Sequence, residues 1–112
     1  MMKLPLSPAA AGLLRALLAR AGIDRDRILL THFRSADWQS LIFIGERHEM
    51  ELRVPGPEAG ALAARLSDGL ADAELKVPGQ IVADIGLECQ PIANADGSFS
   101  LKIEALTIAE SS

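Results

Sequence analysis

The run GERHEMELRVPG, residues 45–56, gathers one histidine, three glutamates and two arginines, the side chains that bind metals or transfer protons. A zinc-binding HExxH helix needs two histidines one helical turn apart, and the run contains only His48. On a strand, His48 and Glu49 point to opposite faces. A zinc deaminase needs a later PCxxC motif, whereas Cys89 stands alone. We interpret the run as a turn followed by a strand, with His48 beside the turn.

A second group of reactive side chains lies in LLTHFRSADW, which contains His32, Arg34, Asp37 and Trp38. A hairpin mouth with these residues would suit a small anion, because the Arg34 guanidinium is a forked donor. We favour a simpler interpretation, in which Asp37 caps a turn and pairs with Arg34 at the surface. Trp38 then packs at the sheet edge. A metal site shared by His32 and His48 is not expected, because a strand of a sequential hairpin would separate them.

The remaining motifs predict no cofactor and no metal. PGPEAG at 55–60 lacks the GxxxxGK[ST] pattern of a phosphate-binding loop, and Glu58 would repel an anion from the helix that begins there. A single cysteine, Cys89, excludes an internal disulfide and a CxxC pair. Its parity with Ile85 and Leu87 predicts an inert thiol on the core face.

The composition predicts one acidic globular domain over residues 1–112. Hydrophobic residues make up 49% of the chain, which is enough to form a core. The net charge of −4 and the scattered basic residues argue against binding to nucleic acid or to an anionic membrane. Arg15 and Arg20 interrupt the N-terminal apolar stretch, which argues against a signal peptide, and no uncharged run is long enough to span a bilayer. We therefore expect the chain to be cytoplasmic, and a single cysteine is compatible with a reducing compartment.

Hydrophobic periodicity predicts a helix followed by three strands. Ser7 and Pro8 suit the N-cap and the first position of a helix whose apolar stripe ends at Gly22. Apolar and polar residues alternate in HEMELRV, and continuous apolar runs precede it. The short polar link SAD predicts a hairpin between the first two strands. We expect the strands at residues 27–34, 38–44 and 48–54.

The second half of the chain predicts another helix and a terminal hairpin. Pro57 opens a helix with leucines one turn apart, which ends before VPGQ. In the hairpin, a three-residue loop with Gly97 in a left-handed conformation sets Cys89 opposite Ile103. A bulge near Pro91 is the alternative. We expect the strands at 81–90 and 99–105, joined through residues 95–97.

The order α-β-β-β-α-β-β predicts an α+β fold, a two-layer sandwich with a five-stranded, mainly antiparallel sheet and two helices on one face. This order, the small size and the acidic charge are similar to those of type III secretion chaperones, which are small acidic dimers. The resemblance implies a chaperone- or adaptor-like role, although the C-terminal helix of those proteins has no counterpart in this chain.

The face of the sheet away from the helices is expected to carry an apolar patch. ILL at 28–30 and LIFI at 41–44 are apolar on both sides of a strand, whereas an uncovered face is normally polar. Such a patch predicts a homodimer or contact with another protein, unless a bulge, a loop or the C-terminal tail covers it. The expected interface residues are Leu29, Phe33, Leu41, Phe43, Leu106 and Ile108.

Two functions follow from these interpretations. We favour a non-enzymatic protein-interaction domain that associates with itself through the helix-free face of the sheet. The alternative is a domain that binds a small anionic molecule, or a minor enzyme, in which several polar side chains converge on one pocket. The candidate ligand-binding residues are His32, Arg34, Asp37, Trp38 and His48.

Overall fold

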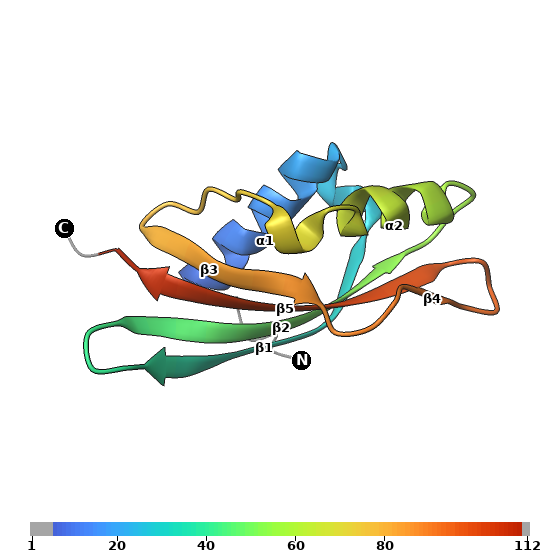
Figure 1. Ribbon diagram of the computed structural model, residues 1–112. Helices are drawn as coiled ribbons and strands as arrows, with labels where there is room; N and C mark the ends of the chain where they lie inside the picture. The colour runs from blue at the N-terminus through green and yellow to red at the C-terminus, as the bar shows by residue number, and fades with distance from the viewer. Residues whose placement is uncertain (1–5, 111–112) are drawn as a thin grey trace.

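The structure, a computed structural model, describes residues 6–110 and consists of one sheet with helices on one face (Figure 1). Its elements in chain order are α1 (Pro8–Ala21), the 3-10 helix η1 (Arg25–Arg27), β1 (Leu29–Gln39), β2 (Ile44–Val54), α2 (Ala59–Ser67), the 3-10 helix η2 (Leu70–Asp72), β3 (Gln80–Leu87), β4 (Ile92–Ala93) and β5 (Phe99–Ala109). The strands are ordered β1-β2-β5-β3, and the short β4 pairs with β5 beyond the end of β3. Every pair is antiparallel. The predicted two-layer α+β fold with five strands and two α-helices is confirmed.

The first helix begins and ends where the sequence predicts. The Ser7 hydroxyl accepts a hydrogen bond from the Ala10 N–H at 3.1 Å, and Gly22 ends the helix with a left-handed φ of 68°. Gly12 permits close contact with the segment before β3, because a Cβ at this position would lie 2.7 Å from Val77 Cγ1. These contacts fix α1 within the helical layer.

The predicted break between the first two strands is wrong, and so is the predicted turn at residues 45–47 beside His48, because these residues lie within β2. Residues 35–37 lie within β1 and pair with residues 46–48 of β2. Pairing along two long strands outweighs the local turn preference of Ser and Asp. The chain turns instead at Leu41 and Ile42, where the Ser40 N–H donates to the Phe43 carbonyl at 2.9 Å. The observed order is therefore α-β-β-α-β-β-β, which differs from the layout on which the resemblance to type III secretion chaperones depended.

The second helix is shorter than predicted. α2 ends at Ser67, and the chain continues from Leu70 as η2. Leu62 and Leu66 are buried in the core. α2 packs against β2 and β5, and η2 packs against β3. The helical layer thus lies over the last three long strands of the sheet.

The three-residue loop of the terminal hairpin is confirmed. The Asn94 N–H donates to the Ser98 carbonyl at 2.8 Å, so that residues 95–97 form the loop. Ile92 then pairs with Ser100 in the register that this loop requires. Local turn chemistry is sufficient to set the pairing next to the loop.

The predicted pairing farther from that loop is wrong. Residues 88–91 leave the regular strand, and Leu87 rather than Cys89 pairs with Ile103. The excursion lies next to Pro91, which cannot donate a backbone hydrogen bond to a ladder. Cys89 is therefore exposed and not on the core face.

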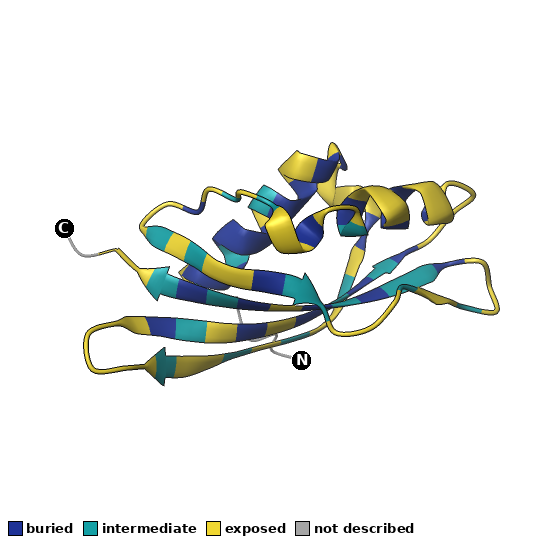
Figure 2. Cartoon of the chain, in the orientation of Figure 1, coloured by how far each residue is buried: buried dark blue, intermediate teal, exposed yellow. Residues whose placement is uncertain are grey.

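The core fills the space between the sheet and the helices. Leu13 and Leu17 of α1, Leu52 of β2 and Leu101 of β5 are almost fully buried. No residue of β1 is buried, and Figure 2 shows this strand as exposed or half-buried along its length. Within residues 6–110, none of the helices has the length and hydropathy that a membrane crossing requires.

Candidate functional site

Two predicted interface residues of β1 lie on opposite faces of the sheet. Leu29 pairs with Arg53 and projects from the helix-free face, where it is 54% exposed. Phe33 pairs with Met50, a core residue, and lies on the helix side. The register of β1 against β2 shifts at Thr31, and this irregularity reverses the alternation of side chains. The prediction that Phe33 joins the helix-free patch is therefore wrong.

The predicted residues of β5 do lie on the helix-free face, near one end of the sheet. Leu106 pairs with Arg47, and Ile108 pairs with Gly45. Both alternate with residues of β5 that are buried beneath the helices. Leu41 and Phe43, predicted as strand residues, lie instead in the turn between β1 and β2.

The centre of the helix-free face is charged, which contradicts a continuous apolar patch. Acidic and basic side chains of β1, β2 and β5 stand in rows across the sheet, as expected for a face in contact with water. Half-buried Glu51 also accepts a hydrogen bond from the Thr31 hydroxyl at 2.8 Å. The two rows are His32, Glu51 and Lys102, and Arg34, Glu49 and Glu104.

Exposed apolar side chains gather at one end of the sheet, around the β1–β2 turn. Leu41 is fully exposed and Ile42 is 81% exposed. The turn, β3 and β5 together border a cleft of about 430 Å³, which Glu110 also lines. We call this surface the apolar end, and it consists of Leu41, Ile42, Phe43, Ile44, Ile81 and Ile108.

The turn residues of the apolar end have no evident role in forming the turn. Tight hairpin turns favour Gly, Asn and Asp, often with positive φ, whereas no described non-glycine residue has positive φ. Ser40 supplies the local polar contact, because its hydroxyl accepts a hydrogen bond from the Phe43 N–H at 3.2 Å. Leu41 and Ile42 are too exposed to add to the core. Their apolar character is therefore available for contact with another molecule.

The five predicted ligand-binding residues do not form one pocket. His32, Arg34 and Trp38 project from the helix-free face of β1, whereas Asp37 pairs with Glu46 on the helix side, where His48 also lies. Residues three apart on a strand point to opposite faces, so the expected pair of Arg34 and Asp37 does not form. The ion pairs among the described residues are Arg27–Glu58 and Arg53–Asp96. Across residues 6–110, no three His, Cys, Asp or Glu side chains are grouped to hold a metal ion.

His48 is the centre of a buried polar chain across three strands. Its Nδ1 lies 2.7 Å from Ser35 Oγ on β1, and its Nε2 lies 2.8 Å from Thr107 Oγ1 on β5. A neutral imidazole has one donor and one acceptor, which the two hydroxyls satisfy. Burial lowers the pKa of His48, and the negative charge of Glu46 opposes this shift more weakly.

The hydrogen-bonded row of Ser35, His48 and Thr107 stabilises the sheet and does not form an open site. His48 is only 2% exposed, which keeps a substrate from the ring. The alternation of His48 with Met50 and Leu52 predicts its inward direction. The sequence does not predict that Ser35 and Thr107 bond to His48, because only the strand register shows that their hydroxyls flank the ring.

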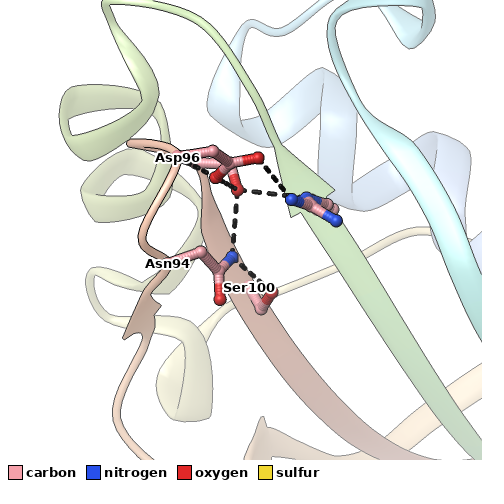
Figure 3. Close-up of polar contacts among 5 residues, drawn as sticks. Asn94, Asp96 and Ser100 are labelled. Carbon is pink, nitrogen blue, oxygen red and sulfur yellow. Dashed lines mark hydrogen bonds and ion pairs between the residues drawn. The ribbon is translucent and has the colours of Figure 1, made fainter.

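A second polar cluster anchors the β4–β5 loop (Figure 3). Asp96 Oδ1 accepts hydrogen bonds from the Ser98 hydroxyl at 2.6 Å and from the Ser98 N–H at 3.0 Å, and Asp96 Oδ2 pairs with the Arg53 guanidinium. These bonds, led by those from Ser98, lower the pKa of Asp96 to about 2. The Asn94 amide donates to the Ser98 and Ser100 hydroxyls. Since its members bond to one another, the cluster ties the loop to β2.

Comparisons with known proteins give a similarity of fold. No family model matches the chain, and no curated protein matches its sequence. A chain in a solved structure entitled "Virion of native gene transfer agent (GTA) particle" is similar in structure, with a TM-score of 0.60 and 15% sequence identity. The match covers 92% of this chain and 98% of that chain. At this identity, what the two chains are shown to share is the fold.

Proposed function

We propose that this protein is a non-enzymatic subunit of a protein assembly, and that the apolar end is its contact with another protein chain. The observation that carries the proposal is the exposure of Leu41 and Ile42 in a turn that does not need them. Burying an exposed side chain of this size contributes about 1.5–3 kcal/mol. A partner that covers both therefore gains a substantial part of a binding free energy.

The surroundings of the turn also suit a protein contact. An interface usually has an apolar centre and a polar rim. Exposed Gln39, Ser40 and Glu110 surround the apolar end, so it resembles such a centre with its rim. The cleft beside the turn offers a concave surface next to a convex one. A groove and a projecting turn together would recognise a shaped protein surface better than a small solute.

The structural neighbour gives this proposal its context. That chain belongs to a virion particle, which is a protein assembly, and a similar fold in this chain is compatible with a place in an assembly. We propose a second copy of the chain as the first partner to test, because twofold homodimers are the commonest assemblies. We also propose a cytoplasmic location, where the thiol of Cys89 would remain reduced.

The proposal is tested by placing a photo-crosslinking amino acid at Ile42 in cells that express the protein. We expect a discrete adduct with one protein chain, identified by mass spectrometry. The matched control is the same amino acid at Ile92, another exposed isoleucine, which lies on β4 away from the apolar end. Equal adducts from both positions, or none from Ile42, would refute the proposed contact.

A stability measurement separates a binding role from a folding role. We expect Ile42→Ser to leave the urea midpoint within the error of the wild type, because the side chain is 81% exposed. The same substitution should remove the adduct when the crosslinker is placed at Leu41. A marked loss of stability in Ile42→Ser would mean that the turn serves folding and not association.

A further inference from the structure

The outer edge of β1 is unprotected. β1 lies at one edge of the sheet, and no described strand pairs with its outer side. Natural edge strands are usually short, interrupted by bulges, or marked by Lys or Pro. Each edge strand has one irregularity, at Thr31 in β1 and between Val82 and Asp84 in β3. The run from Phe33 to Gln39 is nevertheless regular, contains no Lys or Pro, and is longer than either regular part of β3. The β1 edge is thus the better template for an added strand.

We propose that β1 pairs antiparallel with β1 of a second copy of this chain, about a twofold axis at Ala36, so that the two sheets become one. The inference rests on the proposed function in one respect, since both take the partner to be a protein chain. It adds the identity of the partner, the strand edge that it uses and the register. The axis is perpendicular to the sheet, so the helices of both copies lie on the same side.

The backbone of β1 has the right groups directed outward. In an antiparallel ladder, hydrogen-bonded pairs alternate with non-hydrogen-bonded pairs. The hydrogen bond from the Ser40 N–H to the Phe43 carbonyl sets the phase of the β1–β2 ladder. By alternation along the register, every second residue of β1 turns its N–H and C=O away from β2. In the regular part of the strand these residues are Phe33, Ser35, Asp37 and Gln39.

Charge and size select the position of the axis. An axis at Arg34 sets two guanidinium groups against each other, and an axis at Asp37 does the same with two carboxylates. An axis at Ser35 places the Phe33 ring opposite the Asp37 carboxylate. Ala36 is small and uncharged, so its own copy can face it closely across the axis.

The register about Ala36 also pairs complementary side chains. It places Arg34 of each copy opposite Trp38 of the other, on the helix-free face that both residues share. A guanidinium over an indole ring is a favourable cation–π contact. On the helix side, Ser35 of each copy faces Asp37 of the other. The Ser35 hydroxyl can donate to that carboxylate in the tautomer in which it accepts from the Nδ1–H of His48.

The ends of the same register bring apolar residues together. Where the pairing ends, the turn at Leu41 and Ile42 of each copy lies near the start of β1 of the other, which carries Leu29. Leu29 is 54% exposed and Ile42 is 81% exposed in the single chain. About an axis at Ala36, residues 33–39 of β1 pair with residues 33–39 of the other copy, and these seven residues at about 3.3 Å each give a contact roughly 23 Å long. An edge of this length with an apolar cluster at each end fits a second copy of the same chain.

Disulfide trapping tests the register. In a Cys89→Ser background, Ala36→Cys should give a disulfide-linked dimer under mild oxidation, because facing non-hydrogen-bonded residues have Cα atoms about 4.5 Å apart. Gln39→Cys, on the same edge, should crosslink several-fold more slowly, since its partner is Phe33 and not itself. Ala83→Cys, exposed on β3, is the matched control for random collision. If Ala36→Cys does not exceed Ala83→Cys, the edge pairing is wrong; if Gln39→Cys equals Ala36→Cys, the register is wrong.

A proline tests the edge without a new thiol. Asp37→Pro removes an outward N–H while leaving the ladder with β2 intact, because Asp37 and Glu46 form a non-hydrogen-bonded pair in the phase set above. Sedimentation should show twice 11.9 kDa for the wild type and for Asp37→Ala, and 11.9 kDa for Asp37→Pro with unchanged circular dichroism. A folded Asp37→Pro that still dimerises would overturn the inference.

The two proposals fail in different ways. A purified chain that stays monomeric at high concentration and gives no Ala36→Cys dimer overturns the β1 pairing. An adduct of Ile42 with a different protein in the same strain would keep the proposed function. If the chain dimerises through β1 but Ile42 gives no adduct, the apolar end is not a protein contact, and the pairing of β1 with β1 still stands.

Discussion

The buried His48 should make the stability of this fold fall as the pH decreases from neutral. Burial lowers the pKa of His48 in the folded chain, so the unfolded chain binds a proton at a higher pH than the folded one. The stabilising contribution of the neutral ring is complete above the unfolded pKa of about 6.5 and is lost as the pH falls toward the folded pKa. Protonation would also turn both ring nitrogens into donors. The hydroxyl that donates to the neutral ring, either Ser35 at Nδ1 or Thr107 at Nε2, would then have to become an acceptor or lose its hydrogen bond.

The pH dependence of the free energy of unfolding is limited by the single proton that His48 binds. A single group contributes at most about 1.4 kcal/mol to the free energy of unfolding per pH unit. Urea unfolding between pH 7.5 and 5 measures this slope, because ordinary carboxyl groups titrate about one to two units lower. We expect the wild type to lose stability through this range and His48→Gln to give a flatter profile, since an amide can donate and accept without titrating.

The matched control is His32→Gln, which removes the other histidine at an exposed position on β1. Its pH profile should follow that of the wild type. Two results would contradict this role of His48: a full slope in His48→Gln, or a stability that rises as the pH is lowered from 7 to 5. In either case the ring would not be the neutral link between β1, β2 and β5.

Three further predictions concern separate parts of the molecule. Gly45→Ala should lower the urea midpoint, because the Thr107 carbonyl occupies the position of a Cβ, whereas Gly86→Ala has open space there and should be neutral or slightly stabilising. Asp96→Asn should speed amide hydrogen exchange in the β4–β5 loop at pH 5 but matter less near pH 2, because the bonds of the carboxylate are present above its ordinary pKa and are lost as the pH falls toward about 2. The exposed Cys89 thiol should react with a thiol reagent in the folded protein nearly as fast as in urea, and a protected thiol would contradict its placement.

Local signals in the sequence predict the parts of the fold that depend on local chemistry. Ser7 and Gly22 bound α1 because a hydroxyl cap and a left-handed glycine act within one turn of the helix. The alternation in HEMELRV predicts the inward direction of His48, and Gly97 predicts the loop of the terminal hairpin. Each of these features is decided by residues within a few positions of one another.

The features that the sequence misplaces depend on distant pairing. SAD has the composition of a turn, yet its residues pair with residues 46–48 and remain in β1. Leu41 and Ile42 have the composition of a strand, yet they form the turn, because the pairing of residues 35–39 with residues 44–48 leaves them between the two strands. The irregularities at Thr31 and between Val82 and Asp84 reverse side-chain faces, and no residue type marks either position. The candidate site was therefore predicted on the face of the sheet and lies at its end.

The charged rows on the helix-free face decide between two ways of joining sheets. A face-to-face dimer would remove His32, Arg34 and the facing glutamates from water, and unpaired charges are costly to bury. An edge-to-edge dimer leaves those rows in water and covers only the strand that lacks a helix. The same β1–β2 hairpin carries the open edge, the exposed Leu29 and the apolar turn. Because these three features lie on the parts of one hairpin that the chain's own helices do not cover, a second hairpin supplies what the first lacks: a strand that pairs with β1 and an apolar neighbour for each turn.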